Sequence, residues 1–100
     1  MASDFAFDVV DVAGVRVVSL HGQLDLVNAE RVRDAIVLVE GSPVVVDLEG
    51  LAFLDSSGIA ALLEARSRII ESGRAFELRG AQGIVLRVLE VTGLAHLLTD

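Results

Sequence analysis

The feature that most restricts the fold of this sequence is the alternation of strand-like and helix-like segments that follows a predicted hairpin. Apolar residues recur at every second position in the strand patterns and at every third or fourth in the helix patterns. Strands are predicted at 5–10, 15–21, 44–48 and 75–79, and helices at 28–41, 57–71 and 82–91. Strand, helix and strand in succession require parallel pairing through a right-handed crossover. The sequence therefore predicts a mixed α/β sheet.

Local signals define the ends of these segments. Gly14, between the first two strand patterns, predicts an antiparallel hairpin. Asn28 is predicted to be the N-cap of the first helix, and Gly41 to end it. The side chains expected to face the core are Val32, Ala35, Ile36 and Val39 in the first helix, Ile59, Leu62, Leu63 and Ile70 in the second, and Ile84, Val85, Val88 and Leu89 in the third.

The predicted sheet is covered on one face. Two successive crossovers of the same hand, moving in one direction across the sheet, place both helices on that face. The strands at 44–48 and 75–79 alternate apolar and charged residues, which is typical of strands with one solvated face. We therefore expect a single domain over residues 1–100 with a two-layer α/β fold. Its small mixed sheet has the order β-β-α-β-α-β-α, with the helices packed on one face.

Composition excludes several classes of function. The chain has no cysteine, which removes disulfides, thiolate catalysis and Cys-ligated metals, and two isolated histidines offer no metal-ligand spacing. It has no lysine, so a Walker phosphate loop cannot occur. A net charge of −7 argues against nucleic acid and anionic membrane surfaces as partners. The N-terminus lacks the pattern of a signal peptide or membrane anchor, so we expect a cytoplasmic protein without cofactor or metal.

The segment Asp55-Ser56-Ser57-Gly58 is the candidate functional site. It lies where a parallel strand delivers the chain to the carboxyl edge of the sheet and a helix begins, the usual ligand-binding edge of α/β sheets. One interpretation is structural, with a serine as the N-cap. Another is that a serine hydroxyl accepts a phosphoryl group, whose charge the free amides and the helix dipole would tolerate. The two interpretations are compatible.

Other chemistries fit the residues less well. A serine nucleophile in a G-x-S-x-G elbow would need glycine two residues before Ser56, where Leu54 stands. His21 could reach the same edge, whereas His96 is expected to be partly buried. Asp47 has the position of a receiver-type phosphoacceptor, but the further carboxylates and the lysine of such a site are missing. Asp25 could orient a basic group or metal of a partner, although a side-chain-stabilised turn is favoured.

The order of these motifs resembles a known family. The run VVVDLEGLAFLDSSGIAALLEA, preceded by GQLDLVNAERVRDAI and followed by VLEVTGLAHLL, is similar to the STAS domain, specifically to the bacterial anti-sigma factor antagonists. The resemblance extends from about residue 5 to 98. It implies a non-enzymatic protein that binds an anti-sigma factor with serine-kinase activity and so frees a sigma factor. The kinase binds the ATP, and a phosphoserine phosphatase is a possible second partner.

The resemblance also implies roles for individual residues. Ser56, directly after the motif's aspartate, corresponds to the serine that the kinase phosphorylates to switch binding off. The implied partner-binding residues are Asp25, Leu26, Asp55, Ser56, Ser57, Gly58 and Ile59. Gln23 departs from the family, which often has glutamate there. Two alternatives stay open, namely a STAS interaction module of a stress-signalling or lipid-transport assembly without a phospho-switch, and a small serine hydrolase.

Overall fold

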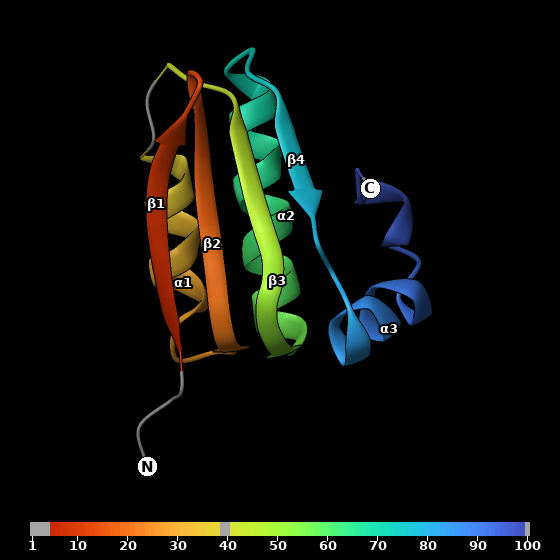
Figure 1. Cartoon of the computed structure of the whole chain (residues 1–100). Coiled ribbons are helices and arrows are strands. Elements are labelled where there is room, and N and C mark those ends of the chain that lie inside the picture. The colour runs from red at the N-terminus through yellow and green to blue at the C-terminus, as the bar shows by residue number, and fades with distance from the viewer. Residues whose placement is uncertain (1–4, 39–40, 100) are drawn as a thin grey trace.

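The strands form one mixed sheet. The computed structural model describes residues 5–38 and 41–99. Its strands, in sheet order, are β1 (Ala6–Val12), β2 (Val15–Leu24), β3 (Val44–Leu54) and β4 (Phe76–Arg79). β1 and β2 are antiparallel, whereas β2–β3 and β3–β4 are parallel. The predicted fold class, with the hairpin at one edge, is confirmed (Figure 1).

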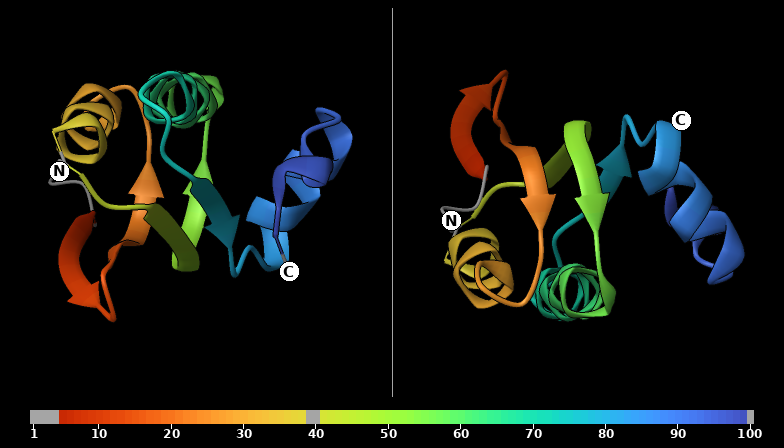
Figure 2. Two further views of the ribbon diagram at one scale, coloured as in Figure 1. Left: turned by 90° about the horizontal axis from the view of Figure 1, so that it is seen from above. Right: turned by 90° about the horizontal axis from the view of Figure 1, so that it is seen from below.

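The two crossover helices, α1 (Ala29–Val37) and α2 (Ser56–Glu71), cover the same face of the sheet, as predicted (Figure 2). α3 (Gly83–Val91) and the short 3₁₀ helix η1 (Ala95–Leu97) lie instead at the β4 edge (Figures 1 and 2). β4 pairs only with residues 44–47 of β3, and α3 contacts β3 as well, so α3 shields part of the edge that β4 leaves free. Within the described ranges, every helix is too short or too polar to cross a membrane.

The hairpin turn has two residues. Val12 pairs with Val15, and the intervening Ala13 and Gly14 have φ angles of 51° and 82°. Positive φ at both central positions is the geometry of a type I′ turn, whose twist matches that of the flanking strands. Gly14 adopts this geometry at little steric cost, while Ala13 adopts it against the preference of an L-residue.

The core is aliphatic; it lies between the sheet and the α1–α2 layer and extends to α3 at the β4 edge. Its largest fully buried side chains are Leu20, Leu24, Ile36, Leu48, Leu54, Ile69, Val18, Val32, Val44, Val46 and Val85. Burying a Val, Leu or Ile side chain contributes about 1.5–3 kcal/mol. The parallel strands β2 and β3 and the helices packed on them are thus held firmly, which fixes the loops that follow the two strands.

Two predictions about helix faces are wrong. Ile70 is 44% exposed and Ile84 is 53% exposed, whereas both were expected to face the core. The buried face of α2 consists of Gly58, Ala61, Leu62, Ala65 and Ile69. Because several of these residues are small, α2 lies close to the sheet, and a pattern that gives weight to large apolar residues misplaces the face. Val39, also predicted to be buried, lies outside the described residues.

β3 is longer than predicted, ending at Leu54 rather than at residue 48. Its register against β2 shifts twice, between Ser19 and His21 and between Gly22 and Gln23, and each shift leaves an extra residue in β3. The inward positions therefore become Leu48, Leu51 and Leu54, three residues apart. Bulges of this kind interrupt the two-residue period by which a strand is recognised in a sequence.

Candidate functional site

The predicted site residues meet at the edge where β2 and β3 end. The Asp55 amide donates to the Leu24 carbonyl at 3.1 Å, so the two chain segments remain neighbours one residue beyond the strands. Asp25 and Asp55, the residues that directly follow the two strands, therefore lie at the same edge of the sheet. We call Asp25, Leu26 and residues 55–59 the rim.

Asp55, and not a serine, caps α2. Its backbone is extended, and its Oδ1 accepts a hydrogen bond from the Gly58 amide at 2.9 Å. The structural interpretation of the motif was therefore wrong about the capping residue, and the helix begins at Ser56 rather than Ser57. Ser56 is exposed and Ser57 is half-buried. In the described part of the chain, no side-chain hydrogen bond uses the Ser56 hydroxyl.

We expect Asp55→Ala to lower the free energy of unfolding by about 1 kcal/mol, because the first-turn amide of Gly58 loses its acceptor. Asp55→Asn should retain most of the stability, since asparagine is an equally good N-cap. Urea unfolding followed by circular dichroism measures both variants. Equal stability of the alanine variant and the parent would contradict the capping role.

Gly58 fits the rim because it has no side chain. It is buried, and a Cβ at this position would lie 2.8 Å from the Leu24 carbonyl oxygen and 2.9 Å from Leu24 Cγ. The first turn of α2 thus packs directly on the last residue of β2. Gly58 can take part in partner binding only by setting this close approach, because its own surface is covered.

The loop from Asp25 to Asn28 presents apolar side chains to solvent. Asp25 Oδ1 accepts from the Val27 amide at 3.0 Å, and its backbone carbonyl accepts from the amide of Ala29 at 2.8 Å. This side-chain-stabilised turn is the arrangement that the sequence favoured for Asp25. Leu26 is 76% exposed and Val27 is 85% exposed. The turn therefore holds two apolar side chains outward, next to the start of α2.

Asn28 holds this loop in place, a role that the sequence prediction missed. It stands at the N-cap position, yet its side chain makes no capping hydrogen bond. Its Oδ1 instead accepts from the Asp25 amide, and its Nδ2 donates to the Gln23 carbonyl, both at 3.0 Å. The residue is 4% exposed. In a sequence, asparagine at a helix start predicts a cap whether or not its side chain caps the helix. The bridging role is therefore visible only in the structure.

We expect Asn28→Ala to lower the free energy of unfolding by about 1–3 kcal/mol, because two backbone groups in a buried setting lose their partners. Asn28→Asp is the matched test: its carboxylate accepts from Asp25 but cannot donate to Gln23, so it should recover part of the loss. Thermal unfolding gives the ranking, and wild-type stability of the alanine variant would contradict the bridging role.

A groove of about 250 Å³ runs from the rim between α1 and α2. Leu26 and Ser57 line it at the rim, and Arg33 and Glu64 line it farther along the helices. Arg33 hydrogen-bonds Asp34 at 2.9 Å and Glu64 at 3.4 Å. The hydrogen bond to Asp34 is the main cause that raises the pKa of Arg33 above its ordinary value, and the guanidinium is charged at physiological pH as in any arginine. The groove thus has charged and apolar lining side by side.

The remaining candidates lie elsewhere. His21 is on the sheet face opposite α2, with its Nε2 3.5 Å from Asp8 Oδ2, and therefore does not reach the rim. His96 is exposed, contrary to expectation, and its Nδ1 lies 3.0 Å from the Gly93 carbonyl oxygen. Asp47 Oδ1 accepts from the Glu49 amide at 2.9 Å on the same face as His21. A Ser-His pair is therefore not assembled at Ser56.

Comparison with known proteins identifies the class. The family model of the STAS domain matches residues 6–99, and the chain therefore belongs to the STAS domain family. Among solved structures, an anti-sigma factor antagonist from Mycobacterium paratuberculosis is 30% identical, with a TM-score of 0.82 over 96% of this chain and 84% of that chain. No curated protein matches at a significant level.

Three further solved structures are similar to this chain. SpoIIAA, an anti-sigma factor antagonist, is 26% identical in its unphosphorylated form, with a TM-score of 0.80 over 95% of this chain and 87% of that chain. SpoIIAA from Bacillus in its phosphorylated form is 25% identical, with a TM-score of 0.72 over 95% and 90%. A sulfate transporter family protein from Wolinella succinogenes shares the fold, at 20% identity and a TM-score of 0.73 over 87% and 73%.

Proposed function

We propose that this chain is an anti-sigma factor antagonist whose unphosphorylated rim binds an anti-sigma factor with serine-kinase activity, and that phosphorylation of Ser56 ends the binding. Similarity to anti-sigma factor antagonists over nearly the whole chain supports the general role. The observation that carries the switch is the cap: because Asp55 holds the first turn of α2, the exposed Ser56 hydroxyl is available for modification.

The proposed step is a phosphoryl transfer. The kinase binds ATP, the Ser56 oxygen forms a bond to the γ-phosphorus, the bond to the β-phosphate oxygen breaks, and ADP leaves while the hydroxyl proton goes to a base of the kinase. The product carries about −1.5 to −2 charge at pH 7. It stands at the positive end of the α2 dipole, where negative charge is tolerated. We therefore expect the folded structure to remain intact after phosphorylation.

The partner-binding surface in this proposal is the rim with the adjoining groove. Leu26 supplies exposed apolar area, and Ser57 lines the groove beside it. Ile59 lies in the first turn of α2. Asp25 and Asp55 make the rim acidic, which favours a basic or polar surface on the kinase. A phosphate on Ser56, next to Asp55 in the chain, adds like charge and steric bulk at the proposed interface, and this costs affinity.

In this proposal the antagonist and the sigma factor cannot bind the kinase at the same time, and this affects transcription. A kinase occupied by the antagonist releases its sigma factor, and phosphorylation of Ser56 returns the kinase to the sigma factor. In this proposal the protein acts in the cytoplasm, catalyses no reaction itself, and is reset by a phosphoserine phosphatase. A STAS module without a switch would bind its assembly through the same rim and keep Ser56 unmodified.

The test is to incubate the protein with a candidate kinase, Mg²⁺ and ATP and to locate phosphate by mass spectrometry. We expect one phosphate, on Ser56, and none in Ser56→Ala. Ser57→Ala is the matched control and should be phosphorylated as the parent is. Phosphate on Ser57, or no phosphate with a kinase that binds the protein, would refute the assignment and leave the interaction module.

A further inference from the structure

We propose that the sheet face opposite α1 and α2, called here the open face, is a second docking surface that takes a basic segment of a partner protein. This surface is separate from the rim, and the inference goes beyond the proposed switch. α1 and α2 lie behind the sheet in Figure 1, and the face toward the viewer carries no helix of the described chain. Its side chains follow from the strand register.

One row of the open face is apolar. Val46 and Leu78 pair across β3 and β4 and belong to the core, so the pair before them, Val45 and Glu77, points to the open face. In register with Val45 are Val17 of β2 and, beyond it, Val10 of β1. Val10 is 51% exposed. Val17 is half-buried and Val45 is only 7% exposed, so the apolar area open to a partner lies over β1 and β2, with Val45 beneath it.

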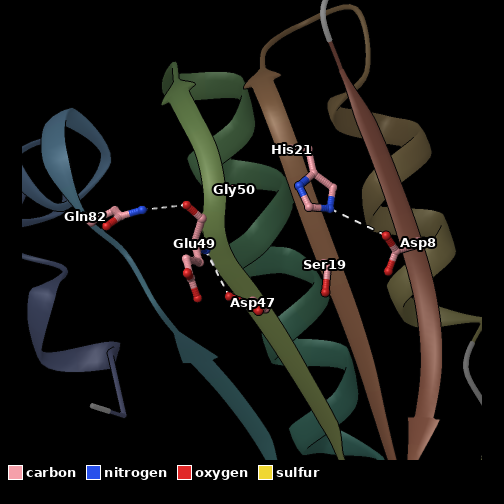
Figure 3. A pocket seen from close by; sticks show the side chains of 7 residues that line it. All are labelled: Asp8, Ser19, His21, Asp47, Glu49, Gly50 and Gln82. Carbon is pink, nitrogen blue, oxygen red and sulfur yellow. Dashed lines mark hydrogen bonds and ion pairs between the residues drawn. The ribbon is translucent and has the colours of Figure 1, made fainter.

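The next row contains two aspartates and lines a hollow. Asp8, Ser19 and Asp47 are in register with one another, two residues along each strand from the valines. With His21, Glu49 and Gln82 they line a hollow of about 410 Å³ (Figure 3). Strand residues two apart are separated by about 6.6–6.8 Å, a distance that matches successive same-face side chains of an extended partner segment.

The walls of this hollow are held in place. Asp47 Oδ1 accepts from the Glu49 amide at 2.9 Å, and Gln82 Nε2 donates to the Glu49 carbonyl at 2.8 Å. A Cβ on Gly50 would overlap with His21 Nδ1, so the imidazole occupies space that only glycine leaves. The hydrogen bond from Gln82 to Glu49 connects the N-terminal end of α3 to β3. The hollow is therefore shaped before any partner arrives.

Charge decides which occupant fits. The open face carries Asp8, Asp47, Glu49 and Glu77, with Arg79 as the cation in register with Asp47. The whole chain has a net charge of −7, so a second copy would bring like charges together. A segment with arginine or lysine two residues from an apolar residue satisfies both rows at once, with the cation beside the carboxylates and the apolar side chain over the valines.

The test is an NMR titration of the ¹⁵N-labelled full chain with a blocked eight-residue extended peptide in which arginine and valine take turns at every second position, with serine at the positions between them, so that both side chains lie on one face. We expect amide shifts confined to β1–β3 positions of the open face. The double variant Asp8→Asn/Glu49→Gln should bind the peptide roughly tenfold more weakly, because the lost charges face the cation. Glu71→Gln/Glu90→Gln, with the same change of net charge at exposed positions of α2 and α3, should bind as the parent does.

Four results would overturn the inference. Shifts centred on the rim, equal weakening in the two double variants, or equal binding of a peptide with glutamate in place of arginine would each show that the open face does not select a basic segment. Self-association through this face in sedimentation experiments would replace the partner by a second copy and overturn it as well. Ser56→Asp should bind the peptide unchanged, which separates this test from the fate of the phospho-switch.

Discussion

Gly58→Ala is expected to destabilise the protein by about 2–3 kcal/mol, because the new methyl group has to enter occupied space. Glycine-to-alanine changes inside a helix usually stabilise by about 0.5–1 kcal/mol, so the expected sign here is reversed. The reason is the close approach of α2 to Leu24, whose carbonyl oxygen and Cγ would both lie within 3 Å of the added atom. The melting temperature should fall by roughly 10–20 °C.

Differential scanning calorimetry of Gly58→Ala against the parent measures this effect. Ser57→Ala is the matched control, one residue away and half-buried, and its melting temperature should change by a few degrees at most. If Gly58→Ala melts at or above the parent temperature, the contact between α2 and β2 is looser than the structure has it.

Phosphorylation of Ser56 is expected to lower the affinity for the kinase-type anti-sigma factor by about a hundredfold, equivalent to about 2.7 kcal/mol. The proposed cause is twofold. The phosphate adds negative charge to a rim that already carries Asp25 and Asp55, and its bulk disturbs the shape complementarity of an interface from which water is excluded. Ser56→Asp, with a smaller charge, should bind more weakly than the parent but more tightly than the phosphoprotein. Ser56→Ala should bind as the parent does and ignore ATP. Isothermal titration calorimetry compares the four proteins.

The folded state should survive the modification. Because Asp55 and not Ser56 supplies the cap, the phosphoprotein should unfold within about 0.5 kcal/mol of the parent, the range of ordinary surface changes. Ser57→Asp, which places a charge on the groove side of α2, serves as a positional control for binding. It should lower the affinity for the kinase less than the phosphate on Ser56 does. The switch hypothesis fails if phospho-Ser56 protein binds the kinase as tightly as the unmodified protein does.

The sequence by itself determined the order of the elements and the sheet topology. Gly14 marks the hairpin turn, and the alternation of strand and helix patterns leaves parallel crossovers as the way to pair the later strands, because a tight turn cannot join parallel neighbours. The same reasoning brings Asp25 and Asp55 to one edge, since the carboxyl ends of parallel strands lie together. These results depend on local periodicity and chain direction, which are properties of the sequence itself.

Only the tertiary structure decided how the residues at that edge share their tasks. Asp55 takes the cap that a serine could have taken, and Asn28 gives up a cap to bridge the loop between Gln23 and Asp25. The bulges of β3 and the buried face of α2 were also set there. The physical reason is that a hydrogen-bonding side chain at a helix start has several partners within reach, and which one it binds depends on the burial and backbone conformation that the packed structure imposes on it.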